Sequence, residues 1–308
     1  MRRELLAVVG LTCTGKGKLA LAVADALGGP DAASIVVCDS AKVYRGADVG
    51  TAKLPPAERR GYEFYMVDVA GPGEAFSAGR YMREGRAACE DVWARGKLPL
   101  VVGGTGLYFR AFVDGIAEMP PADEDVRASL AARRERGEDL HAYLSEVDAA
   151  AAARISPADD KRIVRALEVF ELTGVPLSEL HRAEQPALSA ERIVVVALAA
   201  SRPWLAERVA ERTRRMMAAG LRAEAAELLK IAGDPTAPPL NAIGYRQMVR
   251  LLSGEGDEAG AVMSINRETM RLAKKQRTWF KREPLAVWLD AEEGTARLCE
   301  ETLAIWRP

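Results

Sequence analysis

The sequence predicts an α/β fold, in which a parallel sheet with flanking helices carries an inserted helical domain. Three observations support this prediction. Short apolar runs alternate with helical stretches, which is typical of a parallel sheet covered by helices. The first run leads directly into a glycine-rich phosphate-binding pattern, and one long segment between two later runs contains no convincing strand. The 308 residues are enough for one large domain or two modest ones.

The apolar runs give the order of the strands. We expect strands at Leu5–Val9, Ile35–Cys38, Tyr65–Val69, Leu98–Val102, Ile193–Leu198 and Val287–Leu289. Between the fourth and fifth runs, the chain from Met119-Pro120-Pro121 to Gln185-Pro186 is rich in Ala, Arg and Glu and has helical periodicity. Residues 119–185 are therefore assigned to an inserted helical domain, and residues 1–118 and 186–308 to a catalytic core. The expected core positions of the insertion are Leu130, Leu140, Leu144, Ile155, Ile163, Leu167 and Phe170.

A phosphate-binding loop follows the first strand. Residues 10–17 have the spacing G-x-x-x-x-G-K. Such a loop surrounds an anion with backbone N–H groups at the positive end of a helix, and its lysine adds a charge for a terminal phosphate. The pattern then calls for Ser or Thr to hold Mg²⁺, but this chain has glycine there. We predict a P-loop NTPase-like core whose di- or triphosphate site is formed by Gly10, Leu11, Thr12, Cys13, Thr14, Gly15, Lys16 and Gly17.

Polar residues follow the second and fourth strands. In parallel sheets the carboxyl ends of the strands face the ligand crevice, so Asp39-Ser40 and Gly103-Gly104-Thr105 should lie beside the phosphate loop. Asp39 is either a metal-binding or helix-capping carboxylate, or a general base facing a nucleophile next to the phosphates. Thr105 either caps the following helix or contacts a substrate. The segment Asp48–Lys53 is either a loop over the same site or a surface turn.

Two basic clusters stand out in a chain whose net charge is −1. Asn266–Glu283 carries seven basic and two acidic residues, and the insertion carries a second cluster between Arg127 and Arg165. Either cluster alone would usually be a solvated helix face. Together they favour a track for a nucleic-acid phosphate backbone. The aromatic side chains nearby either stack or pack, and for Trp279 we favour packing.

Composition excludes several other classes. No run approaches the roughly 18 apolar residues of a membrane span, and the N-terminus lacks the cleavage site of a signal peptide. The four cysteines never form a C-x-x-C pair, and the two histidines are isolated, which argues against a zinc site and a disulfide framework. We therefore expect a cytoplasmic protein without a membrane partner.

Taken together, the motifs resemble the tRNA dimethylallyltransferase (tRNA isopentenyltransferase) family over nearly the whole chain. The matching segments, in the family's order, are GLTCTGKG from Gly10, DSAKVYRGADVGTAK from Asp39, GGTGLYFRA from Gly103, DDKRIVRALEVFELTG from Asp159, RPWLAERVAERTRRMMAAGL from Arg202, NAIGYRQ from Asn241 and AKKQRTWFKR from Ala273. Each is modest evidence alone. Seven such segments with suitable gaps are specific.

The resemblance implies transfer of a dimethylallyl group from dimethylallyl diphosphate to the exocyclic amine of the adenosine that follows the tRNA anticodon. The phosphate loop would then hold the diphosphate leaving group, with Mg²⁺ as cofactor. By similarity, Asp39 would accept the proton of the amine, and Thr12, Lys16 and Arg212, or else Arg208, would hold the diphosphate. The tRNA would contact Asp39, Ser40, Ala41, Lys42, Thr105, Arg127, Lys161, Arg162, Ile163, Val164 and Arg165, and the basic C-terminal segment with Lys274 and Lys275.

The chain departs from the family pattern at three places. Gly17 replaces a Ser or Thr that would bind Mg²⁺, so no metal ligand is assigned within the chain. Lys42 stands where the family usually has Gln, and Glu63-Phe64 where it tends to have paired histidines. Lysine has three donors and no acceptor, so it cannot read adenine as an amide does. The alternatives are a weakened relative that binds tRNA, a free-nucleotide isopentenyltransferase and a small-molecule kinase. We expect the protein to act as a monomer.

Overall fold

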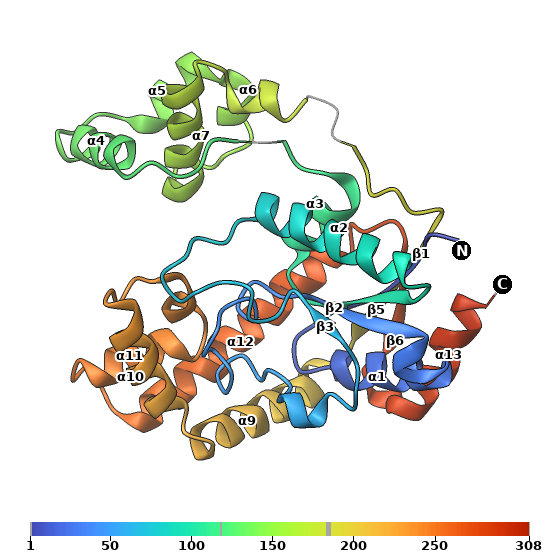
Figure 1. Ribbon diagram of the computed structural model, residues 1–308. Coiled ribbons are helices and arrows are strands. Elements are labelled where there is room, and N and C mark those ends of the chain that lie inside the picture. The colour runs from blue at the N-terminus through green and yellow to red at the C-terminus, as the bar shows by residue number, and fades with distance from the viewer. Residues whose placement is uncertain (1, 118, 183–185, 308) are drawn as a thin grey trace. The chain divides into compact units, whose positions relative to one another are not determined.

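A six-stranded, wholly parallel sheet forms the centre of the larger part of the molecule (Figure 1). The computed structural model describes residues 2–117, 119–182 and 186–307. The strand order is β3-β2-β4-β1-β5-β6. The strands are β1 (Glu4–Gly10), β2 (Ala33–Cys38), β3 (Phe64–Tyr65), β4 (Leu98–Gly103), β5 (Arg192–Ala199) and β6 (Ala286–Asp290). Each apolar run of the sequence thus contributes one strand, and the predicted fold class is confirmed.

The third strand is shorter than predicted. We expected it at Tyr65–Val69, but β3 ends at Tyr65. The backbone is left-handed at Met66 and Asp68, with φ of 61° and 59°. Residues in this conformation cannot continue a strand, so the chain leaves the sheet after Tyr65. The hydrophobicity of the segment reflects burial of Met66 and Ala70 in the core rather than pairing in the sheet.

Helices cover both faces of the sheet. Leu6 and Val8 of β1 share a core cluster with residues of α1 (Lys16–Ala26) and α13 (Thr295–Trp306). Alternate residues of a strand point to opposite faces, so Leu5 and Ala7 face the other side, which α2 (Ala78–Ala94) and α3 (Gly106–Asp114) cover (Figure 1). The central strands are buried on both faces, which is why the sequence shows continuous apolar runs rather than alternation.

A second group of helices lies beyond the carboxyl ends of the strands. It comprises α9 (Arg202–Ala218), α10 (Leu221–Ala232), α11 (Tyr245–Leu252) and α12 (Glu258–Phe280). Their apolar side chains form a core cluster that also includes Val43, Tyr44 and Ala47 from the loop after β2. This packing holds the loop against the helices. Short 3-10 helices occur at Gly29–Asp31, Pro56–Glu58, Pro238–Asn241 and Ala291–Glu293.

The chain divides into two compact units, Met1–Val113 with Leu188–Pro308, and Asp114–Ala187. The smaller unit contains α4 (Glu124–Glu135), α5 (Leu140–Val147), α6 (Ala149–Ala152), α7 (Asp160–Thr173) and α8 (Leu177–Leu180). At the start of each of the first four helices, an aspartate side chain accepts a hydrogen bond from a backbone N–H group of the first turn. These residues are Asp123, Asp139, Asp148 and Asp159. Such caps explain where the helices begin. Glu118 and Gln185, at our predicted domain boundaries, lie outside the described residues.

The core of the smaller unit contains five of the seven positions that we predicted for it: Leu130, Leu140, Leu144, Ile163 and Leu167. Ile155 packs against this cluster and is partly buried. Across the described residues, no helix combines the length and apolar character needed to cross a bilayer.

Candidate active site

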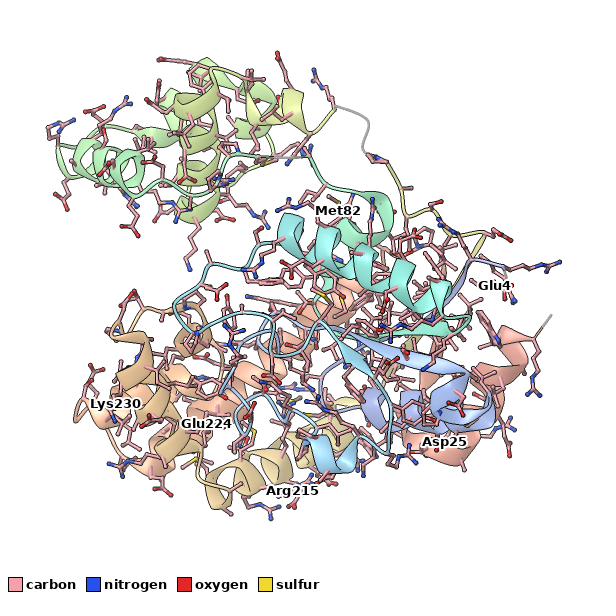
Figure 2. All side chains as sticks on the ribbon, in the orientation of Figure 1. Glu4, Asp25, Met82, Arg215, Glu224 and Lys230 are labelled. Atoms are coloured by element: carbon pink, nitrogen blue, oxygen red, sulfur yellow. The ribbon has the colours of Figure 1, made fainter. Side chains whose placement is uncertain are left out.

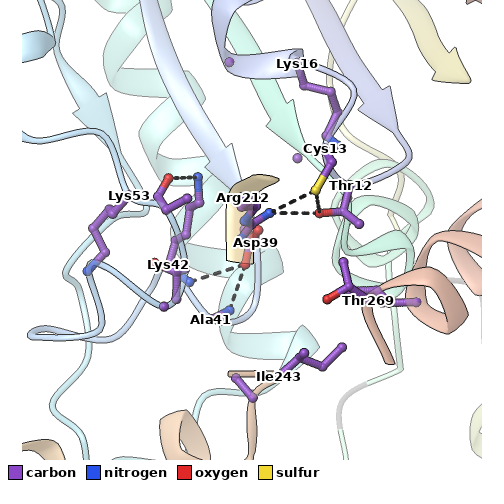
Figure 3. A pocket seen from close by; sticks show the side chains of 18 of the residues that line it. Thr12, Cys13, Lys16, Asp39, Ala41, Lys42, Lys53, Arg212, Ile243 and Thr269 are labelled. Carbon is purple, nitrogen blue, oxygen red and sulfur yellow. Dashed lines mark hydrogen bonds between the residues drawn. The ribbon is translucent and has the colours of Figure 1, made fainter. Parts of the chain in front are cut away.

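A large cavity of about 1710 Å³ opens at the carboxyl ends of β1, β2 and β4 (Figure 3). Its wall includes residues that follow these strands within two positions: Thr12 after β1, Asp39 after β2, and Gly104 and Thr105 after β4. Parallel strands end at the same edge of a sheet, which brings together segments distant in sequence. Further parts of the wall come from α1, the loop 48–55, the segment 241–243 and helices α9, α11 and α12. All lining residues belong to the larger unit.

The phosphate loop has the conformation that its glycines predict. Gly10 has φ of 111°, and a Cβ added there would lie 2.3 Å from the carbonyl oxygen of Leu198, so only glycine fits beside β5. Gly15 is left-handed, and α1 begins at the next residue without a side-chain cap. The first N–H groups of a helix have no acceptor within the helix, so this end is suited to bind an anion.

Two members of the predicted phosphate site shape the loop from within. The N–H of Leu11 donates to the carbonyl oxygen of Leu198, and the Leu11 side chain is buried. The hydroxyl of Thr14 donates to the carbonyl oxygen of Leu11 at 2.7 Å. The Leu11 amide and the Thr14 hydroxyl are thus both hydrogen-bonded within the protein. Cys13, Gly15, Lys16 and Gly17 line the cavity.

Lys16 is the cation of the loop. Its Nζ donates to the carbonyl oxygen of Leu11. Desolvation lowers the pKa of Lys16 from 10.5 to about 8, although the nearby Asp39 carboxylate acts to raise it. The side chain therefore still carries its charge at neutral pH, and a bound anion would stabilise that charge further.

Arg212 extends from α9 to the phosphate loop. Its Nη1 donates to Thr12 Oγ1 at 3.1 Å and lies 3.8 Å from Cys13 Sγ (Figure 3). Arg208, one turn earlier, lines the same cavity, and its guanidinium lies 4.3 Å from the ring centroid of Trp204. Of the two arginines that we considered from the sequence, Arg212 is the one hydrogen-bonded to Thr12.

Asp39 lies in the cavity wall with one carboxylate oxygen anchored. Oδ1 accepts the N–H of Ala41 at 2.9 Å and that of Lys42 at 3.4 Å, so part of its role is to hold the turn after β2 (Figure 3). For Oδ2 no hydrogen-bond partner is found within the described ranges. The backbone thus fixes the orientation of the carboxylate and leaves one oxygen for a ligand.

Thr105 links the ends of two strands. Its Oγ1 accepts the N–H of Ser40 at 3.0 Å, which ties the turn after β2 to the loop after β4.

Lys42 extends along the same wall and donates from Nζ to the carbonyl oxygen of Ala52 at 3.1 Å. Burial lowers the pKa of Lys42, against the effect of Asp39.

Glu224, which the sequence did not single out, holds the loop 48–50. Glu224 is on α10 (Figure 2). Its Oε2 accepts the N–H groups of Asp48 at 3.1 Å and Val49 at 2.8 Å, and its Oε1 accepts that of Gly50 at 3.0 Å. The hydroxyl of Tyr245 donates to Oε1 at 2.6 Å. A single carboxylate on α10 thus binds three consecutive amides. The loop is an ordered wall of the cavity, as one of our two interpretations proposed.

The basic residues of α12 lie partly at the cavity. Arg271 and Lys275 line it, and Lys274 is exposed nearby on the same helix. Trp279, for which we favoured packing, is 37% exposed and also lines the cavity. Its indole contacts the backbone at Gly106, where an added Cβ would lie 2.1 Å from Cδ1. Trp279 therefore both packs and presents an apolar surface to a ligand.

In the smaller unit, a buried glutamate organises the basic residues. Glu168 accepts hydrogen bonds from Arg127 Nε at 2.7 Å, Arg165 Nη1 at 2.6 Å and the N–H of Asp123 at 2.8 Å. Burial acts to raise the pKa of Glu168, but these hydrogen bonds, that of Arg165 first, lower it overall. Arg127 and Arg165, both predicted tRNA contacts, are therefore also structural ion-pair partners.

The segment Lys161–Arg165 is only partly accessible. Lys161 and Arg162 are exposed, and Val164 packs partly against the core. Ile163, however, is buried in the core of the smaller unit, with 3% of its surface exposed. Helical periodicity turns the Ile163 side chain inward, so this side chain is not part of the exposed surface of the segment.

Comparison with known proteins shows the family. A model of the IPP transferase family matches residues 42–283. The chain belongs to this family. It is 43% identical over 301 residues to the tRNA dimethylallyltransferase of Methylococcus capsulatus, covering 96% of this chain and 94% of the relative. It is 42% identical over 314 residues to the enzyme of that name from Symbiobacterium thermophilum, covering 100% and 96%.

Solved structures of IPP transferases have the same fold. The tRNA delta(2)-isopentenylpyrophosphate transferase of Staphylococcus epidermidis is similar with a TM-score of 0.69 and 29% identity, over 98% of each chain. The full-length tRNA isopentenylpyrophosphate transferase of Bacillus halodurans gives a TM-score of 0.67 and 31% identity over all of both chains. A eukaryotic dimethylallyltransferase acting on tRNA gives 0.78 at 22% identity, covering 94% of this chain and 74% of that chain.

The departure of this IPP transferase at Gly17 leaves open space. A Cβ added to Gly17 would meet no heavy atom within 4 Å. The structure thus shows no steric reason for glycine at this position. No cluster of three or more His, Cys, Asp or Glu side chains suited to a metal ion is found within residues 2–117, 119–182 and 186–307.

Proposed function

We propose that this chain transfers a dimethylallyl group from dimethylallyl diphosphate to the exocyclic N6 of the adenosine that follows the anticodon of tRNA, and releases diphosphate. The observation that carries the proposal is the single cavity that holds both a phosphate loop and the Asp39 carboxylate. Family membership and the relatives that are tRNA dimethylallyltransferases support it. A kinase or a free-nucleotide enzyme would have no use for the basic surface of α12.

The chemistry follows from the residues around the cavity. N6 of adenine attacks C1 of the dimethylallyl group, and the C1–O bond breaks with its electron pair going to the diphosphate. Lys16, the Thr12 hydroxyl and Arg212 stabilise the charge that develops on the leaving oxygen, as preorganised donors do in other enzymes. Asp39 Oδ2 accepts the proton that N6 loses. The adenine must leave its stack to reach the cavity, so the tRNA base is flipped out.

Mg²⁺ fits this site as a partner of the diphosphate. Because Gly17 has no hydroxyl and the Thr14 hydroxyl donates to Leu11, the metal would be held by diphosphate oxygens and water, which Mg²⁺ often retains. When bound, it supplies positive charge to the leaving group. The proposal also places the reaction in the cytoplasm and assigns it to a monomeric enzyme.

Transfer of radiolabel tests the function directly. Labelled dimethylallyl diphosphate is incubated with the protein and Mg²⁺, in parallel with unmodified tRNA that has adenosine after the anticodon and with free AMP. We expect label in the tRNA and none in AMP. Label in AMP would identify a free-nucleotide enzyme, and tRNA binding without label would identify a weakened relative.

Replacement of Gly17 by serine is expected to tighten the binding of Mg²⁺ at the diphosphate site. A hydroxyl at this position would supply a direct ligand, worth roughly 1.5–3 kcal/mol for a charge-assisted contact. The Mg²⁺ concentration at half-maximal rate should therefore fall about tenfold or more. Gly17→Ala is the matched control, because it adds the Cβ without the hydroxyl and should not shift the Mg²⁺ titration. Equal titrations for the serine variant and the wild type would show that water replaces the ligand fully.

Charge reversal on α12 is expected to weaken tRNA binding. The double variant Lys274→Glu, Lys275→Glu removes two cations from the exposed surface of the helix. If both contact phosphates, the slope of log K against log salt should decrease by about 1–2. The control is Lys230→Glu with Arg297→Glu, which changes the net charge equally at exposed positions away from the cavity. Identical salt slopes for the two double variants would remove α12 from the tRNA surface.

A further inference from the structure

Gln276 connects the phosphate loop to the loop after β4. It lies on α12 and is 8% exposed. Its Oε1 accepts the N–H of Thr12 at 2.7 Å, and its Nε2 donates to the carbonyl oxygen of Gly104 at 2.9 Å. Both ends of the amide therefore hold backbone groups of segments that are separated by 264 and 172 residues from Gln276 in the sequence.

The fit around this amide is close. A Cβ added to Gly104 would lie 2.4 Å from Gln276 Nε2, so a larger residue at 104 would displace the amide. A primary amide offers an acceptor and a donor on one planar group, and a carboxylate or an ammonium group of similar length cannot offer both. The arrangement thus requires glutamine on one side and glycine on the other.

The contact decides which groups of Thr12 face the cavity. Because the Thr12 N–H points into Gln276, it is not available to a phosphate oxygen. The Thr12 hydroxyl is instead placed 3.1 Å from Arg212 Nη1, where the two groups can bind the same anion. Removal of Gln276 would leave the Thr12 N–H and the Gly104 carbonyl without these partners. Buried groups that lose partners reorganise to recover hydrogen bonds, which would rotate Thr12 away from Arg212.

We propose that Gln276 is a positioning residue, which sets the diphosphate site by orienting the Thr12 hydroxyl toward Arg212. This inference rests on the proposed function insofar as the diphosphate is the leaving group of dimethylallyl transfer. Gln276 acts through Thr12 and does not itself bind the diphosphate.

Binding of inorganic diphosphate provides the first test. Gln276→Met keeps the length of the side chain and removes both hydrogen bonds. We expect the dissociation constant for diphosphate, measured by titration calorimetry, to rise about tenfold. Gln247→Met is the matched control, because Gln247 is also a buried glutamine that binds a backbone N–H, that of Gly244 at 2.9 Å. It should lose similar thermal stability and bind diphosphate within about twofold of the wild type.

A double-mutant cycle tests whether Gln276 acts through Thr12. Thr12→Ala removes the hydroxyl and keeps the N–H. If Gln276 works by orienting that hydroxyl, the effects of Gln276→Met and Thr12→Ala on diphosphate affinity should be strongly non-additive. Additive effects would overturn the proposal, as would unchanged affinity in Gln276→Met or an equal loss in Gln247→Met. If Gln276→Met does not fold, Gln276→Leu, which also removes both hydrogen bonds and fills most of the space, is expected to give the same loss.

The inference and the proposed function fail in different ways. A wild-type protein that binds diphosphate but transfers no label to tRNA would refute the function, and the role of Gln276 would still be measured by diphosphate binding. A wild-type protein that transfers label, together with a Gln276→Met variant of wild-type diphosphate affinity, would refute the inference alone.

Discussion

Asp39→Asn is expected to lower kcat for transfer to tRNA by at least about 10²-fold, with tRNA affinity within about twofold of the wild type. Asparagine keeps an oxygen that can accept the N–H of Ala41, so the turn after β2 should persist. What it removes is the basic oxygen that, in the proposed function, takes the proton from N6. The measurement is single-turnover transfer of label, with tRNA binding followed separately.

A second carboxylate of the same cavity provides the control. Asp48 also lines the cavity, but its Oδ1 pairs with Lys53 Nζ at 2.6 Å. Asp48→Asn changes the charge of the cavity by the same amount, and kcat should fall less than about tenfold, because the proton acceptor remains. Equal losses in both variants would mean that Asp39 contributes through general electrostatics and is not the base.

Arg212→Gln is expected to lower kcat by about 10²–10³-fold, because it removes a cationic donor that, in the proposed function, stabilises the leaving group. The loss should appear with dimethylallyl diphosphate at saturation, since charge on the departing oxygen is greatest in the transition state. Steady-state kinetics that separate kcat from KM are the measurement.

Arg208→Gln is the matched control for Arg212. It removes the same charge one turn away on α9, where the guanidinium lies over Trp204. Its effect on kcat should be at least about tenfold smaller. If the two variants lose the same activity, the overall positive charge of α9 accounts for the effect. The contact between Arg212 and Thr12 would then have no special role.

Most of the fold could be predicted because a buried parallel sheet has a simple signature. Strands covered on both faces are continuous apolar runs, and all six runs form strands. The predicted end of the third strand was wrong, because Met66 and Asp68 adopt the left-handed backbone conformation. Neither residue type indicates this conformation in the sequence. Such conformations depend on packing around the site.

The parts of the site that could be predicted are those that strands place. Asp39 and Thr105 directly follow buried strands, so topology alone brings them to the phosphate loop. Gln276 and Glu224 could not be found in this way. In sequence each is a polar residue on an amphipathic helix, and the backbone groups that it binds lie more than 170 residues away. Glu168 is a similar case, because nothing in its helix distinguishes it from a surface charge.

Because Glu224 binds three backbone N–H groups, the two ends of the cavity differ in electrostatic character. At the phosphate loop, helix α1 presents uncapped N–H groups that attract negative charge. At the loop 48–50 the backbone N–H groups donate to the Glu224 carboxylate, so they are not available to an anion in the cavity. These two stretches of backbone along one cavity therefore differ in polarity. An elongated molecule with one anionic end has a single favourable orientation, and its uncharged end is left to meet the second substrate.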